Sequence, residues 1–470
     1  MIESSLKYDI AIVGGGSAGL IAADFASQLG VRVALLEANR IGGDCTWTGC
    51  VPSKTVIRSA HVARDIARAN GFGIRAGPSS SDMRLIHERV YRTIRSIYEP
   101  TAPEALRRRG IDARIGPTRF LDGNNLQCGD ERIGARRIII CTGAHAVVPD
   151  IRGLAGIPML TYGELFDLET LPPSLIVLGG GPLGVEMAQA FARLGSRVTM
   201  VAPVILDREE PEAQALVTEI LKRDGIEIVP ERALEARRDG DGVELRTDLG
   251  WHGADRLLVA AGRAPNVDDM DLEKARVAYD ANGIRVDRYL RTTTKHIYAC
   301  GDVKGGPQFS HLAGYEGFRA VRNALLPWHS VGTANVLPAV TFSDPEVARV
   351  GPTENDARRQ HHNEVEVHLR SMAKSDRARC DGETDGFIKL LTLGKKKILG
   401  ATIVGSRAGE MIAEIALAME KGLPIDAIAG TIHAYPTWST DVQLAAVEVM
   451  MQRMTSGLTG RTLRWLSRRG

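Results

Sequence analysis

Two cysteines, Cys45 and Cys50, stand close together in the segment GGDCTWTGCVPSK, behind two glycines and ahead of a proline. Such a pair could form a structural disulfide, half of a zinc site or a reversible redox couple. The 470-residue chain has only six cysteines, which disfavours a secreted disulfide scaffold and favours a reducing compartment. In that compartment a closely spaced pair is more often catalytic or metal-binding than structural.

Two glycine-rich segments of one pattern accompany the cysteines. Residues 8–40 and 174–203 each predict a strand, a G-x-G-x-x-G turn, a helix and a second strand. Such glycines permit the tight bend, the approach of a pyrophosphate and close helix packing, and the N–H groups that start the helix face the phosphates. We therefore expect two dinucleotide-binding folds. Their glycines are Gly14, Gly16 and Gly19 in the first copy and Gly179, Gly181 and Gly184 in the second.

The two copies differ at the end of their second strand, where an acid would bind a ribose 2′-hydroxyl and repel a 2′-phosphate. The first copy has Glu37 there, and the second has Ala202. The first fold therefore suits FAD or NAD, whereas the second is expected to accept NADPH at least as well as NADH. Two such folds in one chain favour a flavin and a nicotinamide that exchange a hydride.

The remaining patterns predict an α/β chain with a distinct C-terminal part. RIIICTGAHAVVP and HIYACGDV each place an apolar strand before a small-residue turn, and the second ends in Asp302, an acid suited to a ribityl hydroxyl. From about residue 336, strand-like segments and an amphipathic helix that ends at Gly422 predict a separate α+β domain.

Composition narrows the function classes. Hydrophobic residues make up 44% and charged residues 25% of the chain, and the formal net charge of +2 gives no basis for nucleic-acid binding. No apolar run approaches the roughly 20 residues that span a bilayer. The N-terminus leads directly into a predicted strand, so we expect no signal peptide and a cytoplasmic protein. The tail RTLRWLSRRG is expected to be a solvated end, and contact with an anionic membrane is the alternative.

Together these motifs resemble those of the class I pyridine nucleotide–disulfide oxidoreductases, the flavoprotein family of dihydrolipoamide dehydrogenase, glutathione reductase and mercuric reductase. The markers are GGDCTWTGCVPSK, GGGPLGVEMA, AAGRAPN, ACGDV and FSDPEVARVG, in that order. The resemblance implies two Rossmann-like domains, for FAD and NAD(P)H, and a C-terminal α+β domain that forms a homodimer. The implied boundaries are 1–150 and 271–335 for the FAD domain, 151–270 for the NAD(P)H domain and 336–470 for the dimerisation domain.

The resemblance also implies roles for particular residues. Cys45 and Cys50 would form the redox disulfide, with Cys50 receiving electrons and Cys45 meeting the acceptor, while Lys54 and Glu186 would pair at the reactive edge of the flavin. A helix that starts in this segment would lower the pKa of the thiols. A zinc site would need another pair of ligands nearby, and no second cysteine pair stands in the sequence, so we expect no metal cofactor. The residues expected to bind the cofactors are Gly14, Gly16, Ser17, Ala18, Gly19, Glu37, Gly43, Lys54, Thr142, Gly143, Asp302, Gly179, Gly181, Gly184, Glu186, Gly262 and Arg263.

The chain departs from the family's disulfide reductases near its C-terminus. Those enzymes carry His-Pro-Thr-x-x-Glu, which supplies an acid and base to the partner's active site, whereas HAYPTWST here has Tyr435 in place of the His and Thr440 in place of the Glu. A free tyrosine has a pKa of about 10 and is a poor base at neutral pH. His433 is the alternative base.

These departures favour an acceptor other than a disulfide. Mercuric reductase has a tyrosine at the place of Tyr435, and a soft metal ion needs thiolates more than a proton shuttle. The chain lacks that enzyme's paired-cysteine tail, since its last cysteine is Cys380. We expect an FAD-dependent NAD(P)H oxidoreductase that acts on a soft metal ion or a quinone. The alternatives are dihydrolipoamide dehydrogenase or another low-molecular-weight disulfide reductase, and a flavoprotein that senses redox state without steady turnover.

Overall fold

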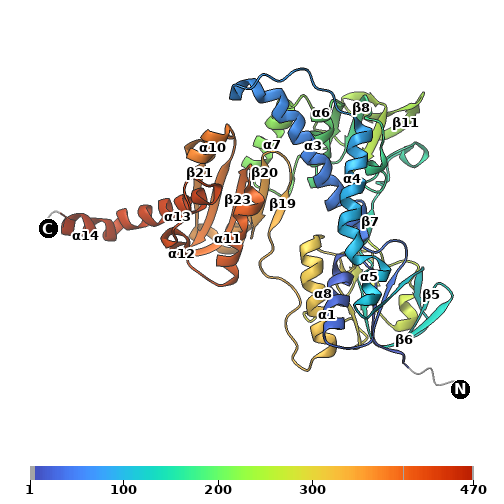
Figure 1. Ribbon diagram of the computed structural model, residues 1–470. Coiled ribbons are helices and arrows are strands. Elements are labelled where there is room, and N and C mark those ends of the chain that lie inside the picture. Colours follow the sequence, from blue (N-terminus) through green and yellow to red (C-terminus); the bar gives the residue numbers. More distant parts are fainter. Residues whose placement is uncertain (1–5, 395, 468–470) are drawn as a thin grey trace. The chain divides into compact units, whose positions relative to one another are not determined.

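The computed structural model describes residues 6–394 and 396–467. These residues form two compact units (Figure 1). The first comprises the described residues up to Gly179 together with Ala190–Val201 and Glu231–Ala334, and the second comprises Gly180–Gln189, Ala202–Pro230 and the described residues from Asn335 onward. The domain boundaries given above stay a prediction.

A seven-stranded sheet forms the core of the first unit, in the order β3-β2-β1-β6-β5-β4 with β18 also paired to β6. Strands β3, β2, β1, β6 and β18 run parallel, which requires helices or loops on both faces. Helices α1 (Ser17–Gln28) and α8 (Ser310–Leu325) pack side by side over one face (Figure 1). The strands are β1 (Tyr8–Val13), β2 (Val33–Glu37), β3 (Ile111–Ile115), β4 (Thr118–Phe120), β5 (Asn125–Cys128), β6 (Glu131–Ile140) and β18 (Ile297–Ala299).

The cysteine segment folds as two successive helices, α2 (Gly43–Trp47) and α3 (Cys50–Arg68). Thr48 and Gly49 separate them, and a Cβ on Gly49 would lie 2.9 Å from the carbonyl oxygen of Asp44, so this position has no room for a side chain. Two further helices follow, α4 (Met83–Tyr98) and α5 (Pro103–Arg108). The predicted helix start is therefore confirmed for Cys50, whereas Cys45 lies inside the preceding short helix.

The second glycine-rich segment also folds as predicted. Strands β9, β8 and β14 pair in parallel. The glycine turn joins β8 to helix α6 (Pro182–Leu194), and β9 follows that helix. The remaining elements of this region are β8 (Ser174–Leu178), β9 (Arg197–Val201), α7 (Pro211–Arg223), β10 (Glu227–Val229), β11 (Glu235–Asp239), β12 (Gly242–Thr247), β13 (Gly250–Ala254) and β14 (Arg256–Val259). Between the two folds, β7 (Ala144–Ala146) pairs with β15 (Arg263–Pro265).

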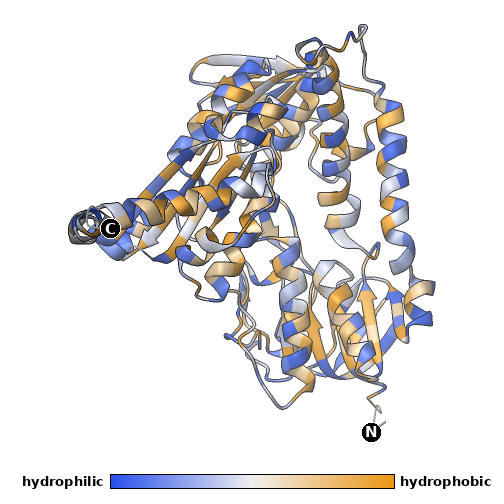
Figure 2. Cartoon of the chain, turned by 60° about the vertical axis from the view of Figure 1, so that its left-hand side comes forward, coloured by the Kyte–Doolittle hydropathy of each residue, from blue (hydrophilic) through white to orange (hydrophobic). Residues whose placement is uncertain are grey.

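An antiparallel sheet in the order β19-β20-β23-β22-β21 forms the C-terminal part of the second unit. Its apolar face packs against helices α11 and α13, and hydrophobic residues concentrate along the strands (Figure 2). The described part of α14 after its first turn is exposed, and the last three residues of the basic tail lie outside the described residues. The elements are β19 (Ala339–Thr341), β20 (Glu346–Val350), α9 (Glu354–His361), β21 (Val365–Ser371), α10 (Asp376–Asp381), β22 (Phe387–Leu393), β23 (Lys397–Gly405), α11 (Ala408–Glu420), α12 (Ile425–Gly430), α13 (Trp438–Thr455) and α14 (Gly457–Ser467).

Candidate active site

The turn between β1 and α1 is built from bare backbone. Gly14 has a left-handed φ of +104°, and a Cβ there would lie 2.3 Å from the carbonyl oxygen of Cys141. A Cβ on Gly19 would lie 1.8 Å from the carbonyl oxygen of Gly14. Gly16 caps α1 without any side-chain hydrogen bond, so the first N–H groups of the helix remain available for a phosphate. This turn fits the pyrophosphate of FAD.

The cysteine helix rests directly on this turn. Gly43, the first residue of α2, has φ +57°, and a Cβ there would lie 2.7 Å from Gly16 Cα. The backbone N–H of Gly42 donates to the carbonyl oxygen of Gly15 at 2.8 Å. Gly42 and Gly43 of the cysteine segment therefore contact the turn between β1 and α1, and Cys45 stands two residues after Gly43.

The predicted sugar-binding residues lie at the same edge of the sheet. Glu37 ends β2, and its carboxylate accepts hydrogen bonds from the backbone N–H groups of Gly15, at 2.6 Å, and Asn39, at 2.9 Å. Asp302 follows β18, and burial raises the pKa of its carboxyl group. Its neighbour Gly301 would place a Cβ 3.6 Å from that of Ala18 at the start of α1. Both acids thus stand where the nucleotide of a Rossmann fold binds.

The structure brings Cys45 and Cys50 into contact. The thiols hydrogen-bond to each other, and Cys50 Sγ lies 3.4 Å from the hydroxyl oxygen of Ser310. The hydrogen bond from Cys50 and then burial raise the pKa of Cys45, while hydrogen bonds from Ser310 and Ser17 oppose that rise. The expected lowering of the Cys45 pKa is therefore wrong for the reduced pair, because one thiol suppresses ionisation of the other.

Sequence reasoning missed a charged cluster around the residue that precedes Cys45. Arg263 Nη2 lies 2.6 Å from Asp44 Oδ2 and 3.4 Å from Asp302 Oδ2, and the Tyr162 hydroxyl donates to Asp44 at 3.1 Å. Arg263 was predicted to bind a cofactor, and that role stays a prediction; in this structure its guanidinium pairs with these two acids and lies over the Tyr162 ring. The acid at position 44, adjacent to Cys45, was the signal that could have revealed this cluster.

A second cysteine pair exists in space. Cys141 and Cys300 follow the paired strands β6 and β18, and their buried sulfur atoms lie 3.4 Å apart. The statement that the chain has no second pair is therefore wrong, because adjacent parallel strands join residues that are far apart in sequence. The hydrogen bond from Cys141 and burial raise the pKa of Cys300, which keeps the Cys300 thiol protonated. Among the described residues, no group of three or more His, Cys, Asp or Glu side chains is arranged to hold a metal ion.

Thr142 and Gly143 join two predicted segments. The Thr142 hydroxyl donates to the carbonyl oxygen of Asn266 at 2.9 Å, and the Asn266 backbone N–H donates to the carbonyl oxygen of Gly143 at 3.0 Å. This contact ties the AAGRAPN segment, which includes Gly262, to the strand end beside the flavin fold.

Lys54 lies on α3 in the first unit and Glu186 on α6 in the second, so their pairing stays a prediction. Glu186 is buried, and its Oε1 accepts from the Phe342 N–H at 2.9 Å.

Tyr435 and His433 have different surroundings. Tyr435 is 70% exposed, and its hydroxyl donates to Asp376 at 3.0 Å, which raises the pKa of the phenol. The ring of His433 has both nitrogen atoms engaged, Nδ1 at 2.9 Å from Thr431 O and Nε2 at 2.9 Å from Glu414 Oε2. Burial lowers the pKa of His433, but the hydrogen bond to Glu414 outweighs it and raises the pKa. In this chain Tyr435, and not His433, is presented outward.

A cavity of about 370 Å³ lies beyond the second glycine turn. Ala202 lies in its wall, and a Cβ on Gly180 would lie 2.3 Å from the carbonyl oxygen of Val204, so this turn is also tight. Because the residue after the second strand meets the adenosine ribose in such folds, the cavity suits the adenosine end of NAD(P)H. The described residues that line this cavity include no Lys or Arg, and Glu219 is the one charged residue among them.

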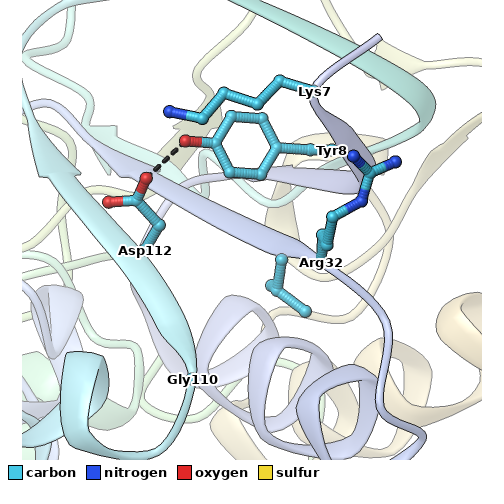
Figure 3. A pocket seen from close by; sticks show the side chains of 6 residues that line it. Lys7, Tyr8, Arg32, Gly110 and Asp112 are labelled. Atoms are coloured by element: carbon cyan, nitrogen blue, oxygen red, sulfur yellow. Dashed lines mark hydrogen bonds between the residues drawn. The ribbon is translucent and has the colours of Figure 1, made fainter.

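Another cavity, of about 420 Å³, lies at the amino-terminal ends of β1 and β2 and just before β3 (Figure 3). Its polar groups pair among themselves and with their neighbours, since Tyr8 donates to Asp112 and Arg32 binds Asp9. Ligands of parallel sheets bind at the carboxyl ends of the strands. This cavity therefore lies at the wrong end to belong to the nucleotide site.

Two family models match the chain. Residues 8–317 match the pyridine nucleotide-disulphide oxidoreductase model, and residues 337–446 match the dimerisation domain of the same family. These matches confirm the predicted family and fold, and the dimerisation domain indicates a homodimer. Within the described residues, no helix has the length and hydropathy needed to cross a membrane.

Relatives of known activity match over nearly the whole chain. A mercuric reductase of Shigella flexneri is 36% identical over 94% of this chain and 81% of its own length. A dihydrolipoyl dehydrogenase of Geobacillus stearothermophilus is 32% identical over 96% of this chain and 97% of its own. The solved structure of the HOCl-induced flavoprotein disulfide reductase RclA from Escherichia coli superposes with a TM-score of 0.85 at 28% identity, covering 94% of this chain and 99% of that one.

The contact between Gly43 and Gly16 predicts a specific cofactor defect. Gly43→Ala places a methyl group 2.7 Å from Gly16 Cα, so the turn must move. We expect FAD affinity to fall about tenfold or more, since such backbone strain costs about 1–3 kcal/mol. Gly30→Ala is the matched control, because Gly30 also has a left-handed φ, +75°, but no atom within 4 Å. Equal loss of FAD from both purified variants would contradict the inference that the Gly43–Gly16 contact shapes the FAD-binding turn.

The cavity beside Ala202 predicts the coenzyme preference. NADPH should be at least as good a donor as NADH, because Ala202 does not repel a 2′-phosphate, but the preference should stay below about tenfold without a lining cation. Ala202→Glu should shift the ratio of kcat/KM values towards NADH. Steady-state kinetics with both coenzymes measures this ratio, and a tenfold preference of the unmodified enzyme for NADH would refute the prediction.

Proposed function

The chain belongs to the pyridine nucleotide-disulphide oxidoreductase family, and we propose that it passes electrons from NAD(P)H through the Cys45–Cys50 pair to a soft metal ion or a quinone. Members of this family use FAD and NAD(P)H. The observation that carries the proposal is the contact between the two thiols, held against the glycine turn of the FAD fold. We further propose that the protein acts in the cytoplasm.

Bound FAD supplies a ring system that accepts a hydride from a nicotinamide and can pass an electron pair to a disulfide. The chain's own residues then handle the acceptor. Ser17 and Ser310 hydrogen-bond Cys45 and favour its thiolate. With a soft cation, the two thiols lose two protons and bind the ion as thiolates; the pair then closes to the disulfide, and its two electrons go to the ion. With a quinone, the dithiol becomes a disulfide, and both electrons and both protons go to the quinone oxygens. Cys45 is partly exposed and Cys50 is exposed, and this difference does not indicate which thiol meets the acceptor. The assignment of Cys45 to the acceptor therefore rests on the resemblance.

The C-terminal segment favours these acceptors over a disulfide. Tyr435 presents a phenol with a raised pKa. The buried Thr440, in the first turn of α13, donates its hydroxyl to the carbonyl oxygen of Ala434, which precedes the helix, at 2.7 Å. In a homodimer we propose that Tyr435 completes the site of the partner subunit. The relatives include mercuric reductases, and one solved relative is a Cu(II) complex of RclA from Escherichia coli.

One observation favours a second candidate, a dihydrolipoyl-dehydrogenase-like disulfide reductase. His433 and Glu414 form an imidazole–carboxylate pair of the kind that handles protons for a dithiol. A screen with FAD-loaded protein, NAD(P)H and mercuric ion, cupric ion, quinones, lipoamide or glutathione disulfide separates the candidates. Failure with every acceptor would leave the redox-sensing flavoprotein.

The thiol pair predicts the effect of its removal. Cys45→Ser and Cys50→Ser should each abolish reduction of mercuric ion, because one sulfur neither binds a soft ion tightly nor forms the internal disulfide. FAD should stay bound in both variants, because its cradle is backbone. Stopped-flow and steady-state NADPH oxidation measure the loss. Undiminished turnover of a quinone by both variants would show that this acceptor bypasses the thiols.

Tyr435 predicts weak activity on disulfides. Turnover of lipoamide or glutathione disulfide should fall short of that of a histidine-bearing reductase by roughly 10²–10⁴-fold, the usual contribution of general acid–base catalysis. Tyr435→Phe should lower turnover of a metal ion or quinone. Tyr435→His with Thr440→Glu should raise disulfide turnover, and a Glu at the third position of α13 preserves the capping box with Thr437. Robust disulfide reduction by the unmodified enzyme would contradict this account, and His433→Ala would then test His433 as the base.

A further inference from the structure

Lys389 is buried in the second unit, and the proposed chemistry does not use it. It lies in the middle of β22, which pairs with a strand on each side, and only 2% of the residue is exposed. Its ammonium Nζ lies 3.0 Å from Glu210 Oε2, 2.9 Å from Glu212 Oε1 and 2.8 Å from Glu354 Oε2. A rigid sheet therefore presents one cation to three carboxylates.

Lys389 and Glu354 are charged at neutral pH. Burial alone would lower the pKa of Lys389, but the hydrogen bonds with Glu354, Glu212 and Glu210 outweigh it and raise the pKa. The same hydrogen bond lowers the pKa of Glu354. Desolvation cancels much of the attraction in a buried ion cluster, so packed apolar side chains in place of the whole cluster would stabilise the fold about as well. Stability alone therefore does not account for a lysine at this position. The elements that carry its carboxylate partners indicate what it does.

Two of the carboxylates belong to the start of helix α7. Glu210 is the N-cap residue, and its backbone carbonyl accepts hydrogen bonds from the N–H groups of Ala213, at 2.9 Å, and Gln214, at 3.0 Å. Glu212 lies in the first turn. The same turn and the next carry Pro211, Gln214 and Ala215, which line the cavity beside Ala202. The contacts of Lys389 therefore end at one wall of that cavity.

A second cation of the C-terminal sheet supports the segment before α7. Arg349 of β20 places Nε 2.8 Å from Glu209 Oε2. The side chain of Gln214 donates to the backbone carbonyl of Glu209 at 2.9 Å, so this contact also bears on a residue that lines the cavity. Glu210 adds a third tie, since its Oε1 accepts from the backbone N–H of Glu354, the first residue of α9, at 2.7 Å. The wall is held by charge from two strands of one sheet.

We propose that Lys389 is a positioning residue for the nicotinamide coenzyme: it holds the first turn of α7 and, through it, the wall of the cavity that receives the adenosine end of NAD(P)H. The inference rests on the proposed function, because it takes that cavity as the coenzyme site. Lys389 acts through Glu210 and Glu212 and makes no contact of its own with the coenzyme.

The test compares three variants of the FAD-loaded enzyme. Lys389→Met removes the charge at similar length, Lys389→Arg keeps it, and Lys397→Met alters an exposed lysine at the start of the neighbouring strand β23. Calorimetric titration with NADP⁺ and NAD⁺ gives Kd without reducing the enzyme, and steady-state kinetics gives KM and kcat. Lys389→Met should raise Kd and KM by roughly two- to thirtyfold, with kcat at saturating coenzyme within about twofold. Lys389→Arg should recover most of the affinity, and Lys397→Met should match the unmodified enzyme.

The outcomes separate positioning from stability. A folded Lys389→Met enzyme with a lower Tm but unchanged Kd and KM would overturn the proposal. If this variant does not fold, Glu212→Gln replaces it, because Glu212 is half-exposed and its loss leaves the other two carboxylates. A smaller rise in Kd is then expected, and an unchanged Kd overturns the proposal. An unmodified enzyme that binds neither coenzyme would overturn the proposed function itself, and this inference with it.

Discussion

The active-site half of the molecule depends on one contact between bare backbone, that of Gly43 with Gly16. Gly43 has a left-handed φ, and a Cβ at this position would lie 2.7 Å from Gly16 Cα, so no side chain fits without a shift of the backbone. The contact places the first cysteine helix against the turn whose N–H groups suit a pyrophosphate. The two thiols and the turn that suits a pyrophosphate therefore share one edge of the parallel sheet, where such folds bind their ligands.

Electrostatics around the thiols follows from this placement. Asp44, the neighbour of Cys45 in the sequence, forms an ion pair with Arg263, whose Nη2 lies 2.6 Å from Asp44 Oδ2. The pKa of Cys45 is raised, because its thiol hydrogen-bonds to Cys50 and is buried. The pair loses its protons when a soft cation binds both sulfur atoms as thiolates, or when the dithiol is oxidised to the disulfide.

The local sequence was enough to predict the helices and strands, and also the chemistry of residues that lie within one motif. The glycine spacing predicted both turns, and apolar periodicity predicted the strands of the C-terminal sheet and the helix that ends at Gly422, because these signals depend on neighbours a few residues apart. The pairing of Cys141 with Cys300, the hydroxyl of Ser310 beside Cys50 and the position of Arg263 were not predictable in this way. Each joins segments more than a hundred residues apart, and only the tertiary packing of strands and helices decides their distance.

The sequence by itself determined the family, the two nucleotide folds and the cysteine pair, because each is written in residues that must be contiguous to form a turn or a helix start. The tertiary structure decided which charges and thiols interact. It turned His433 inward to Glu414 and left Tyr435 exposed, although the two residues are separated by one position. It also buried Lys389 among three carboxylates. The physical reason is that burial and Coulomb energy depend on separation in space, which sequence spacing does not contain.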